Sequence, residues 1–279
     1  MTALPPLVIN AALTGMVPRK KDNPHVPETP HEIAEDVERC VAAGASIVHL
    51  HGRDEHGDPT YRRDVYAEIV AAVRSRSAEA IVCVSTSGRT FKAFEERSAV
   101  LGLEGDLRPD MASLTLGSMN FPREASVNEP EMIRRLAETM QERGIVPELE
   151  IFDLGMLDYA HFLIERGALR PPYYFNVILG SLGTLAATPL NLATVAARMP
   201  PGAAWAGGGI GRYQRSVTAM AVTMGGHVRI GLEDNLWLDD ERSTLATNEQ
   251  LVGWIAGVAR AIGRDVADPL TARKLVGLS

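Results

Sequence analysis

The sequence predicts an α/β protein with the fold of a (β/α)8 TIM barrel. The chain has 279 residues, close to the roughly 250 residues of a typical barrel of this kind. Hydrophobic residues make up 46% and charged residues 23% of it, as is ordinary for a globular protein. Eight short apolar segments alternate with longer amphipathic segments. This count favours a closed barrel over a doubly wound open sheet, which usually has fewer strands.

Each apolar segment is short enough to be one buried strand, and each amphipathic segment is long enough to be one helix. Strands are expected at residues 7–13, 46–51, 80–85, 111–116, 146–152, 174–179, 203–207 and 227–232. Helices are expected at residues 30–43, 64–74, 91–101, 130–141, 156–165, 190–198, 213–224 and 248–262. We expect residues 1–279 to form a single barrel domain with a short C-terminal helical extension after Gly263.

The first predicted helix shows clear signals at both of its ends. Thr29 is a suitable N-cap, Pro30 suits the first turn, and Glu32 follows the cap by three residues. Gly44 suits the C-terminal end. The helix is therefore predicted to begin and end within a residue or two of these positions.

Charge and cysteine content exclude several classes of function. The net charge of −7 argues against general binding to nucleic acid or to an anionic membrane, since both require a basic surface. No apolar run reaches the ~18 residues of a membrane span, and residues 1–6 lack the pattern of a signal peptide. Cys40 and Cys83 are the only cysteines. They are expected to be buried thiols in a reducing compartment, the cytoplasm.

His49 and His51 form the clearest local signal. Residues two apart in a strand project from the same face, so both imidazoles can converge on one point. They end a predicted strand, and this end is the active-site face of a barrel. The pair indicates a metal site, because imidazole is a common zinc ligand. Two structural histidines held by hydrogen bonds are the alternative.

Glu233 is the candidate third ligand. It follows the last predicted strand, and alternate barrel strands contribute side chains to shared layers. Glu233 can therefore approach the two histidines across the first strand. Two histidines and one glutamate, with an open position, are typical of a catalytic zinc site. Asp234 is then a candidate base, although a capping or turn aspartate is the alternative.

Other polar residues also gather at predicted strand ends. Ser85 and Ser87 follow the third strand, where an ordinary polar turn is the alternative. Glu148 and Glu150 alternate along the fifth strand, and two carboxylates on one interior face are costly unless they are paired or functional. Arg229 in the last strand is a candidate partner for them, or a candidate ligand for a substrate carboxylate.

A glycine-rich segment at residues 206–211 follows the seventh predicted strand. Barrels often bind phosphate near strands seven and eight, so a nucleotide-bearing cosubstrate can lie there. No Gly-Lys-Ser/Thr follows, so the segment is not a Walker loop. A tight turn that requires glycine is the alternative.

Five segments carry a resemblance to a known family. Residues 10–15, 43–51, 146–150, 206–212 and 226–235 resemble the β-keto acid cleavage enzymes, typified by 3-keto-5-aminohexanoate cleavage enzyme. The resemblance is collinear and extends over essentially the whole chain. It implies a zinc-dependent homotetrameric barrel. This transferase would condense a β-keto acid with acetyl-CoA and release acetoacetate and a new acyl-CoA.

The resemblance also implies roles for individual residues. His49, His51 and Glu233 would bind zinc. Asp234 would be the catalytic base, assisted by Ser85 and Arg229, and Glu148 would be a further acid of the pocket. The residues expected to contact substrate are Thr14, Val17, Ser87, Thr115 and Gly209.

One position departs from the family pattern. The family member that acts on an aminated substrate carries a glutamate where this chain has Val17. We therefore expect a substrate without a cationic tail, and Met16 and Val17 indicate an apolar or small uncharged tail. The basic residues Arg19, Lys20 and Lys21 keep an anionic tail open, although a basic run is more often a solvated surface.

Two alternatives to this function remain at the level of sequence. One is a metal-dependent aldolase or hydrolase that needs no CoA, and the other is a barrel that binds a metabolite without turnover. The metal is also open, because two histidines and a carboxylate can hold iron or manganese.

Overall fold

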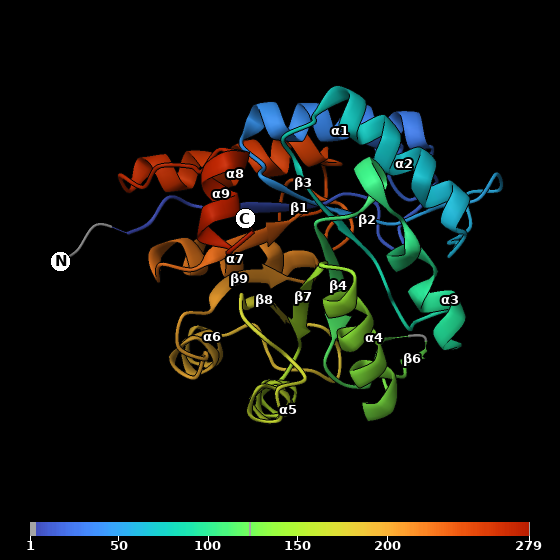
Figure 1. Cartoon of the computed structure of the whole chain (residues 1–279). Coiled ribbons are helices and arrows are strands. Elements are labelled where there is room, and N and C mark those ends of the chain that lie inside the picture. The colour runs from blue at the N-terminus through green and yellow to red at the C-terminus, as the bar shows by residue number, and fades with distance from the viewer. Residues whose placement is uncertain (1–3, 123, 279) are drawn as a thin grey trace.

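Eight parallel strands close into a barrel in the computed structural model, which describes residues 4–122 and 124–278. Going around the barrel, the strands lie in the order β1-β10-β9-β8-β7-β4-β3-β2 (Figure 1). The (β/α)8 prediction is thereby confirmed. The bounds are β1 Ile9–Ala12, β2 Ile47–Leu50, β3 Ile81–Val84, β4 Met111–Thr115, β7 Val146–Ile151, β8 Tyr174–Leu179, β9 Ala204–Gly209 and β10 His227–Ile230.

The position of β1 between β2 and β10 is what brings the candidate ligands together. Asn10 pairs with Arg229 of β10 on one side and with Ile47 of β2 on the other. Further along β1, Ala12 pairs with His49. The chain segments that carry the histidines and Glu233 are therefore separated by a single strand.

Helices surround the barrel, with α1, α2 and α8 along the top of Figure 1 and α5 and α6 below. The capping box predicted for α1 is present, because Thr29 accepts from the Glu32 backbone and Glu32 accepts from the Thr29 backbone. The helices are α1 Pro30–Ala43, α2 Arg63–Arg76, α3 Phe94–Ser98, α4 Pro130–Glu142, α5 Leu154–Glu165, α6 Pro189–Ala197, α7 Gln214–Thr223, α8 Asn248–Ala261 and α9 Pro269–Leu275.

Two regions differ from the predicted elements. The helix predicted at 91–101 is split into α3 and a 3-10 turn, η1 Ala99–Gly102, and a further turn, η2 Gly105–Leu107, precedes β4. A small antiparallel hairpin, β5 Met119–Asn120 with β6 Ala125–Ser126, stands in the loop after β4. Two-residue strands contain too few positions to show a periodic pattern, so the hairpin was not predicted.

The amino end of the barrel is closed by the C-terminal helix α9. Ala272 and Val276 pack into one apolar cluster with Val8, Ile47 and Tyr174 from the barrel strands. This closed end fixes the strands, and the opposite, carboxyl end remains for a functional cavity.

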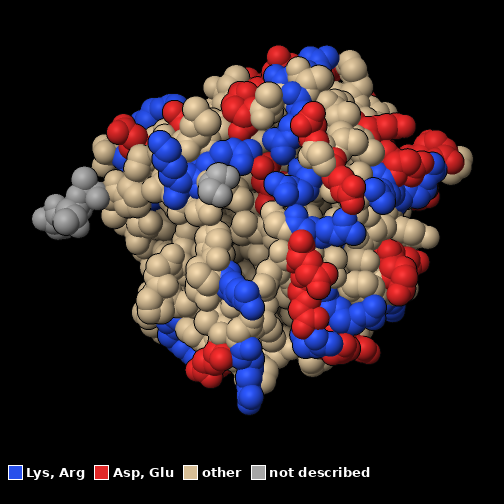
Figure 2. Space-filling view, viewed as in Figure 1, with Lys and Arg blue, Asp and Glu red and all other residues tan. Residues whose placement is uncertain are grey.

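Both cysteines are buried and free. Among the described residues, no helix is long and apolar enough to cross a membrane. Figure 2 shows acidic and basic side chains interspersed over the right of the molecule, toward α2, α3 and α4, with fewer charges toward α5 and α6. The predictions about residues 1–3 and 279 lie outside the described part of the chain.

Candidate functional site

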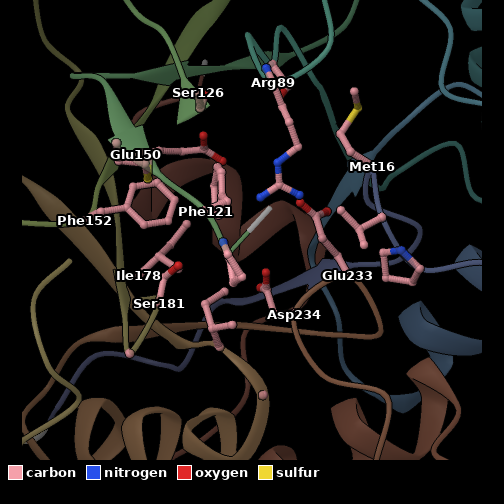
Figure 3. A pocket seen from close by; sticks show the side chains of 18 of the residues that line it. Met16, Arg89, Phe121, Ser126, Glu150, Phe152, Ile178, Ser181, Glu233 and Asp234 are labelled. Carbon is pink, nitrogen blue, oxygen red and sulfur yellow. The ribbon is translucent and has the colours of Figure 1, made fainter. Parts of the chain in front are cut away.

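A cavity of about 840 Å³ opens at the carboxyl ends of the barrel strands. Figure 3 shows side chains from several strand ends and their following loops turned into it. Its lining includes His49, His51, Arg229, Glu233 and Asp234. These five residues, all singled out from the sequence as chemically active, therefore share one chamber at the face where barrels place their active sites.

His49, His51 and Glu233 form a group whose ligand atoms lie within 4.8 Å of one another. The two Nε2 atoms are 3.1 Å apart, His51 Nε2 is 3.3 Å from Glu233 Oε1, and His49 Nε2 is 3.7 Å from Glu233 Oε2. The predicted convergence of these three side chains is confirmed.

The donor set fits a divalent metal ion. Ligand atoms of a tetrahedral zinc site lie roughly 3.3 Å apart, given bonds of about 2.0–2.1 Å, and the distances between these side chains are close to that value. Glu233 Oε2 is buried with no hydrogen-bond partner among the described residues. A cation bound by the three residues would satisfy this oxygen.

Glu148 lies beneath His49 in the barrel interior. Its Oε2 is 2.7 Å from His49 Nδ1, and its Oε1 accepts from Asn10 Nδ2 at 2.6 Å. Burial disfavours the charged forms of both residues, but their mutual attraction outweighs it. The attraction lowers the pKa of Glu148 to about 2. Together with the negative charge of Glu233, it raises the pKa of His49 to about 9. Glu148 therefore orients the imidazole and leaves Nε2 directed at the ligand group.

Arg229 is the central cation of a buried carboxylate cluster. Its side chain contacts Glu233 Oε1 at 2.8 Å, Asp234 Oδ2 at 2.9 Å, Glu150 Oε1 at 3.3 Å and Glu148 Oε2 at 4.0 Å. Burial opposes the charge, but these carboxylates outweigh it and raise the pKa of Arg229. Arg229 is thus the partner that the two glutamates of β7 were expected to need.

Asp234 and Glu150 have elevated pKa values within the same cluster. Burial raises the pKa of Asp234 against the attraction of Arg229, and Glu233 adds repulsion. Burial likewise raises the pKa of Glu150, whose Oε2 accepts from the Thr115 hydroxyl at 2.7 Å. A carboxylate with a raised pKa in a cavity is a candidate for proton transfer.

Four further predicted residues line this cavity, namely Val17, Ser85, Ser87 and Thr115. Ser85 Oγ accepts from the backbone N–H of Ser87 at 3.2 Å, so the turn after β3 has the local hydrogen bonding that the alternative reading expected. Both serines nevertheless line the same cavity as the ligand group.

Thr14, Gly209 and Glu148 are not among the described residues that line the cavity. The Thr14 hydroxyl is buried and donates to the Pro27 carbonyl at 3.1 Å, so it holds the β1 loop. A Cβ at Gly209 would lie 2.4 Å from the Tyr213 carbonyl oxygen, so this glycine permits close packing of the turn η3 Gly211–Tyr213. The contact of Thr14 and Gly209 with substrate stays a prediction, and in this structure both residues have a packing role.

Sequence reasoning missed several residues of the cavity. Arg89, Phe121, Tyr213 and Arg242 all line it, and they come from outside the strands. Loop residues carry no periodic signal, so only their position after predicted strand ends could have drawn attention to them.

The cavity lies at the catalytic end of a closed barrel, and carboxylates with perturbed pKa values lie beside three potential metal ligands. These features define a TIM-barrel enzyme with a candidate metal centre. Comparison with known proteins specifies which enzymes these are. Residues 6–278 match the family described as beta-keto acid cleavage enzyme. The chain belongs to this family, and the prediction that it is an enzyme of this kind is confirmed.

Two curated relatives match nearly end to end. The 3-keto-5-aminohexanoate cleavage enzyme of Fusobacterium nucleatum is 36% identical over 274 residues, with 98% of each chain covered. The 3-oxoadipate:acetyl-CoA acetyltransferase of Cupriavidus necator is 38% identical over 280 residues, with 98% of this chain and 95% of that one covered. Among solved structures, apo ObcA shares the fold with a TM-score of 0.82 at 22% identity, covering 91% of this chain and 66% of its own.

Proposed function

We propose that this protein is a zinc-dependent β-keto acid cleavage enzyme that uses acetyl-CoA. It would convert a β-keto acid and acetyl-CoA into acetoacetate and the CoA thioester of the remaining acyl group. The observation that carries the proposal is the juxtaposition of Asp234, with its raised pKa, and the ligand group of His49, His51 and Glu233 in one cavity. The homotetramer and the cytoplasmic location stay predictions.

Asp234 is the proposed base. The methylene between the keto and carboxylate groups of a β-keto acid must lose a proton before its carbon can attack a thioester. Asp234 lies in the cavity with one carboxylate oxygen 2.9 Å from Arg229 Nε. This contact fixes the orientation of the Asp234 carboxylate. Arg229 would then place its positive charge next to the enolate that forms.

The ligand group would hold the divalent ion through His49, His51 and Glu233. A zinc ion bound there supplies Lewis acidity toward the substrate's keto oxygen. Glu148 would act as a positioning residue, because it touches His49 and Asn10 rather than the cavity. Ser85, which lines the cavity, is proposed to donate its hydroxyl hydrogen to a substrate oxygen.

The side of the cavity near β9 suits the CoA cosubstrate. Gly211, Arg212 and Arg242 line it there, and the Gly211 backbone donates to the Asp234 carbonyl at 2.7 Å. Two arginines beside a turn that leads into helix α7 offer the positive charge that phosphate groups require. The thioester end of CoA would then point toward Asp234.

The substrate tail is proposed to lack a positive charge. Val17 and Met16 line the cavity at the β1 loop, and neither can pair with an ammonium group. The basic residues Arg19, Lys20 and Lys21 are not among the described residues that line the cavity. Arg19 pairs with Glu28 and Asp58 on the outside, and Lys20 pairs with Glu32.

The decisive test is product analysis by mass spectrometry with acetyl-CoA and a mixture of short β-keto acids. The proposal expects acetoacetate and one new acyl-CoA in equal amounts, with no consumption of keto acid when acetyl-CoA is left out. Consumption without acetyl-CoA would instead support a CoA-independent aldolase or hydrolase. A purified sample without stoichiometric zinc, active all the same after chelation, would contradict the metal assignment.

A further inference from the structure

The turn that carries Glu233 packs tightly against the end of β1. The Glu233 backbone N–H donates to the Ala12 carbonyl at 3.1 Å. A Cβ at Gly231 would lie 2.1 Å from the same oxygen, and a Cβ at Gly15 would lie 2.6 Å from Glu233 Cγ. The position of the proposed third ligand therefore depends on how the ends of β1 and β10 are held together.

A side chain from α8 joins these two strand ends. Asn248, the first residue of α8, accepts at Oδ1 from the Leu232 backbone N–H at 2.8 Å. Its Nδ2 donates to the Leu13 carbonyl at 3.2 Å. Leu232 directly precedes Glu233, and Leu13 directly follows β1. The amide thus supplements the backbone pairing of β1 with β10 at the point where the chain continues into Glu233.

The Asn248 side chain is fully buried, and its partners fix the orientation of its amide. Its Nδ2 donates a second hydrogen bond, to Asp36 Oδ2 on α1, at 2.6 Å. The Asp36 side chain is itself only 4% exposed, and its other oxygen accepts from Arg39. Both amide hydrogens and the amide oxygen of Asn248 therefore have partners. Movement of this side chain would leave buried polar groups unsatisfied, which costs free energy.

Gln214, the first residue of the neighbouring helix α7, offers a comparison. Its Nε2 donates to the Gly231 carbonyl at 2.9 Å, but its Oε1 is buried with no partner among the described residues. The amide of Gln214 therefore reaches only the β10 side, whereas the amide of Asn248 bridges β10 and β1. This bridge sets the distance between Glu233 and β1, the strand that separates Glu233 from the two histidines.

We propose that Asn248 is a positioning residue for the metal centre, because it holds Glu233 in reach of the ion that His49 and His51 would share. The inference rests on the metal centre of the proposed function, and Asn248 is not among the described residues that line the cavity. Oxygens of Glu233 lie 3.3 and 3.7 Å from the histidine nitrogens, and metal–ligand bonds tolerate deviations of only about 0.2 Å. A small shift of β10 relative to β1 would therefore weaken the site although all three ligands are still present.

Asn248→Ala removes the bridge and keeps a residue that favours a helix. We expect the metal affinity, measured as the chelator concentration that removes half of the metal, to fall by about tenfold or more, since outer partners of metal ligands typically contribute about 10–100-fold. The visible absorption of the cobalt-substituted protein, which depends on the arrangement of the ligands, should change as well. A wild-type affinity would overturn the proposal. A lower affinity with an unchanged spectrum would also overturn it, because Asn248 would then not control the arrangement of the ligands.

Thr247→Ala is the matched control. Thr247 caps the same helix, since its hydroxyl accepts from the Gln250 backbone N–H at 3.2 Å, and this hydrogen bond lies within α8 rather than at a strand end. Its replacement should lower the melting temperature of the metal-free protein and leave both the metal affinity and the spectrum unchanged. An equal loss of affinity in Thr247→Ala and Asn248→Ala would overturn the proposal, because the stability of α8 would then be the cause.

A second variant keeps the test valid if Asn248→Ala does not fold. Asn248→Asp combined with Asp36→Asn exchanges the two side chains, so the site keeps its volume and its single buried carboxylate. The exchanged carboxylate can accept from the Leu232 N–H and from the new amide, but it cannot donate to the Leu13 carbonyl. We expect a metal affinity several-fold below that of the wild type, and an affinity equal to the wild type would overturn the proposal.

Metal affinity is measured without substrate, so this inference and the proposed reaction can fail separately. A wild type that binds zinc but does not convert keto acids with acetyl-CoA would contradict the proposed reaction, and the chelator titrations would still decide the role of Asn248. A wild type that cleaves keto acids, with no loss of metal affinity in Asn248→Ala, would overturn the inference alone. A wild type that binds no metal would overturn both the metal assignment and the inference.

Discussion

His49 Nδ1 lies 2.7 Å from a carboxylate oxygen of Glu148, on the side of the imidazole opposite to His51 and Glu233. Histidines that bind metal usually donate their second ring N–H to a carboxylate, a backbone carbonyl or water. The contact fixes both the tautomer and the ring orientation, and it makes the imidazole more basic. Glu148 can therefore affect metal binding although it does not line the cavity.

Replacing Glu148 with glutamine should weaken metal binding. An amide can still accept from Nδ1, but it lacks the negative charge that strengthens the imidazole as a ligand. Loss of such an outer partner typically lowers metal affinity or activity by about 10–100-fold. Metal content after dialysis against a graded chelator, measured by atomic spectroscopy, would report the change.

Glu150→Gln is the matched comparison for this variant. Glu150 lies on the same strand but contacts Thr115 and Arg229 rather than His49. The Glu150→Gln variant should lose its metal at the same chelator concentration as the wild type, whatever the effect on turnover. Equal metal loss in both variants would indicate that the negative charge of the barrel interior matters, and not the contact with His49.

Replacing Asp234 with asparagine should remove the base and keep the shape of the cavity. General base catalysis contributes typically about 10²–10⁴-fold, so kcat should fall within this range while the KM for acetyl-CoA changes little. Asp240→Asn, at an exposed position six residues further along the chain, should be silent. Steady-state kinetics decide the matter, and a turnover within a few-fold of wild type would exclude Asp234 as the base.

Strand geometry accounts for the part of the site that the sequence predicted. The spacing of His49 and His51 places both rings on one strand face, and the adjacency of β1 to β2 and β10 explains how Glu233 joins them. Arg229 and the two glutamates of β7 are also strand residues. Their alternation and the shared layers of a barrel were enough to predict that they meet.

Loop geometry explains what the sequence did not predict. Arg89 and Phe121 stack although they are far apart in the chain, and no pattern in either loop encodes that contact. Thr14, which the family resemblance assigned to substrate contact, turns its hydroxyl to the Pro27 carbonyl. The direction of a side chain after a strand end depends on loop torsions, which periodicity does not determine.

His227 should make stability depend on pH. Burial lowers its pKa to about 4, and its Nδ1 accepts from the Val8 backbone at 3.1 Å. The neutral ring is therefore favoured in the folded state, whereas the unfolded chain takes up a proton below about pH 6.5. The stabilisation is fully present above pH 6.5 and is lost as pH falls toward 4, by roughly 3 kcal/mol in all.

His227→Gln keeps an acceptor for Val8 but does not titrate. Thermal unfolding of the variant should show a shallower loss of stability than wild type between pH 6.5 and pH 4. His56→Gln, at an exposed position, should follow the wild-type curve. Parallel curves for wild type and His227→Gln would show that His227 does not carry this pH dependence.

Replacing Val17 with glutamate should move the substrate preference toward a cationic tail. Val17 lines the cavity and is 52% exposed, so a longer side chain can be accommodated without loss of stability. A carboxylate there would attract a substrate ammonium. We expect kcat/KM for 3-keto-5-aminohexanoate, relative to 3-oxohexanoate, to rise by about tenfold, as a partly solvated ion pair allows. Val17→Gln, whose side chain has the size of glutamate but no charge, separates charge from shape. An equal rise of the kcat/KM ratio in both variants would show that this position selects tails by volume. A ratio equal to that of the wild type in both variants would show that other residues recognise the tail.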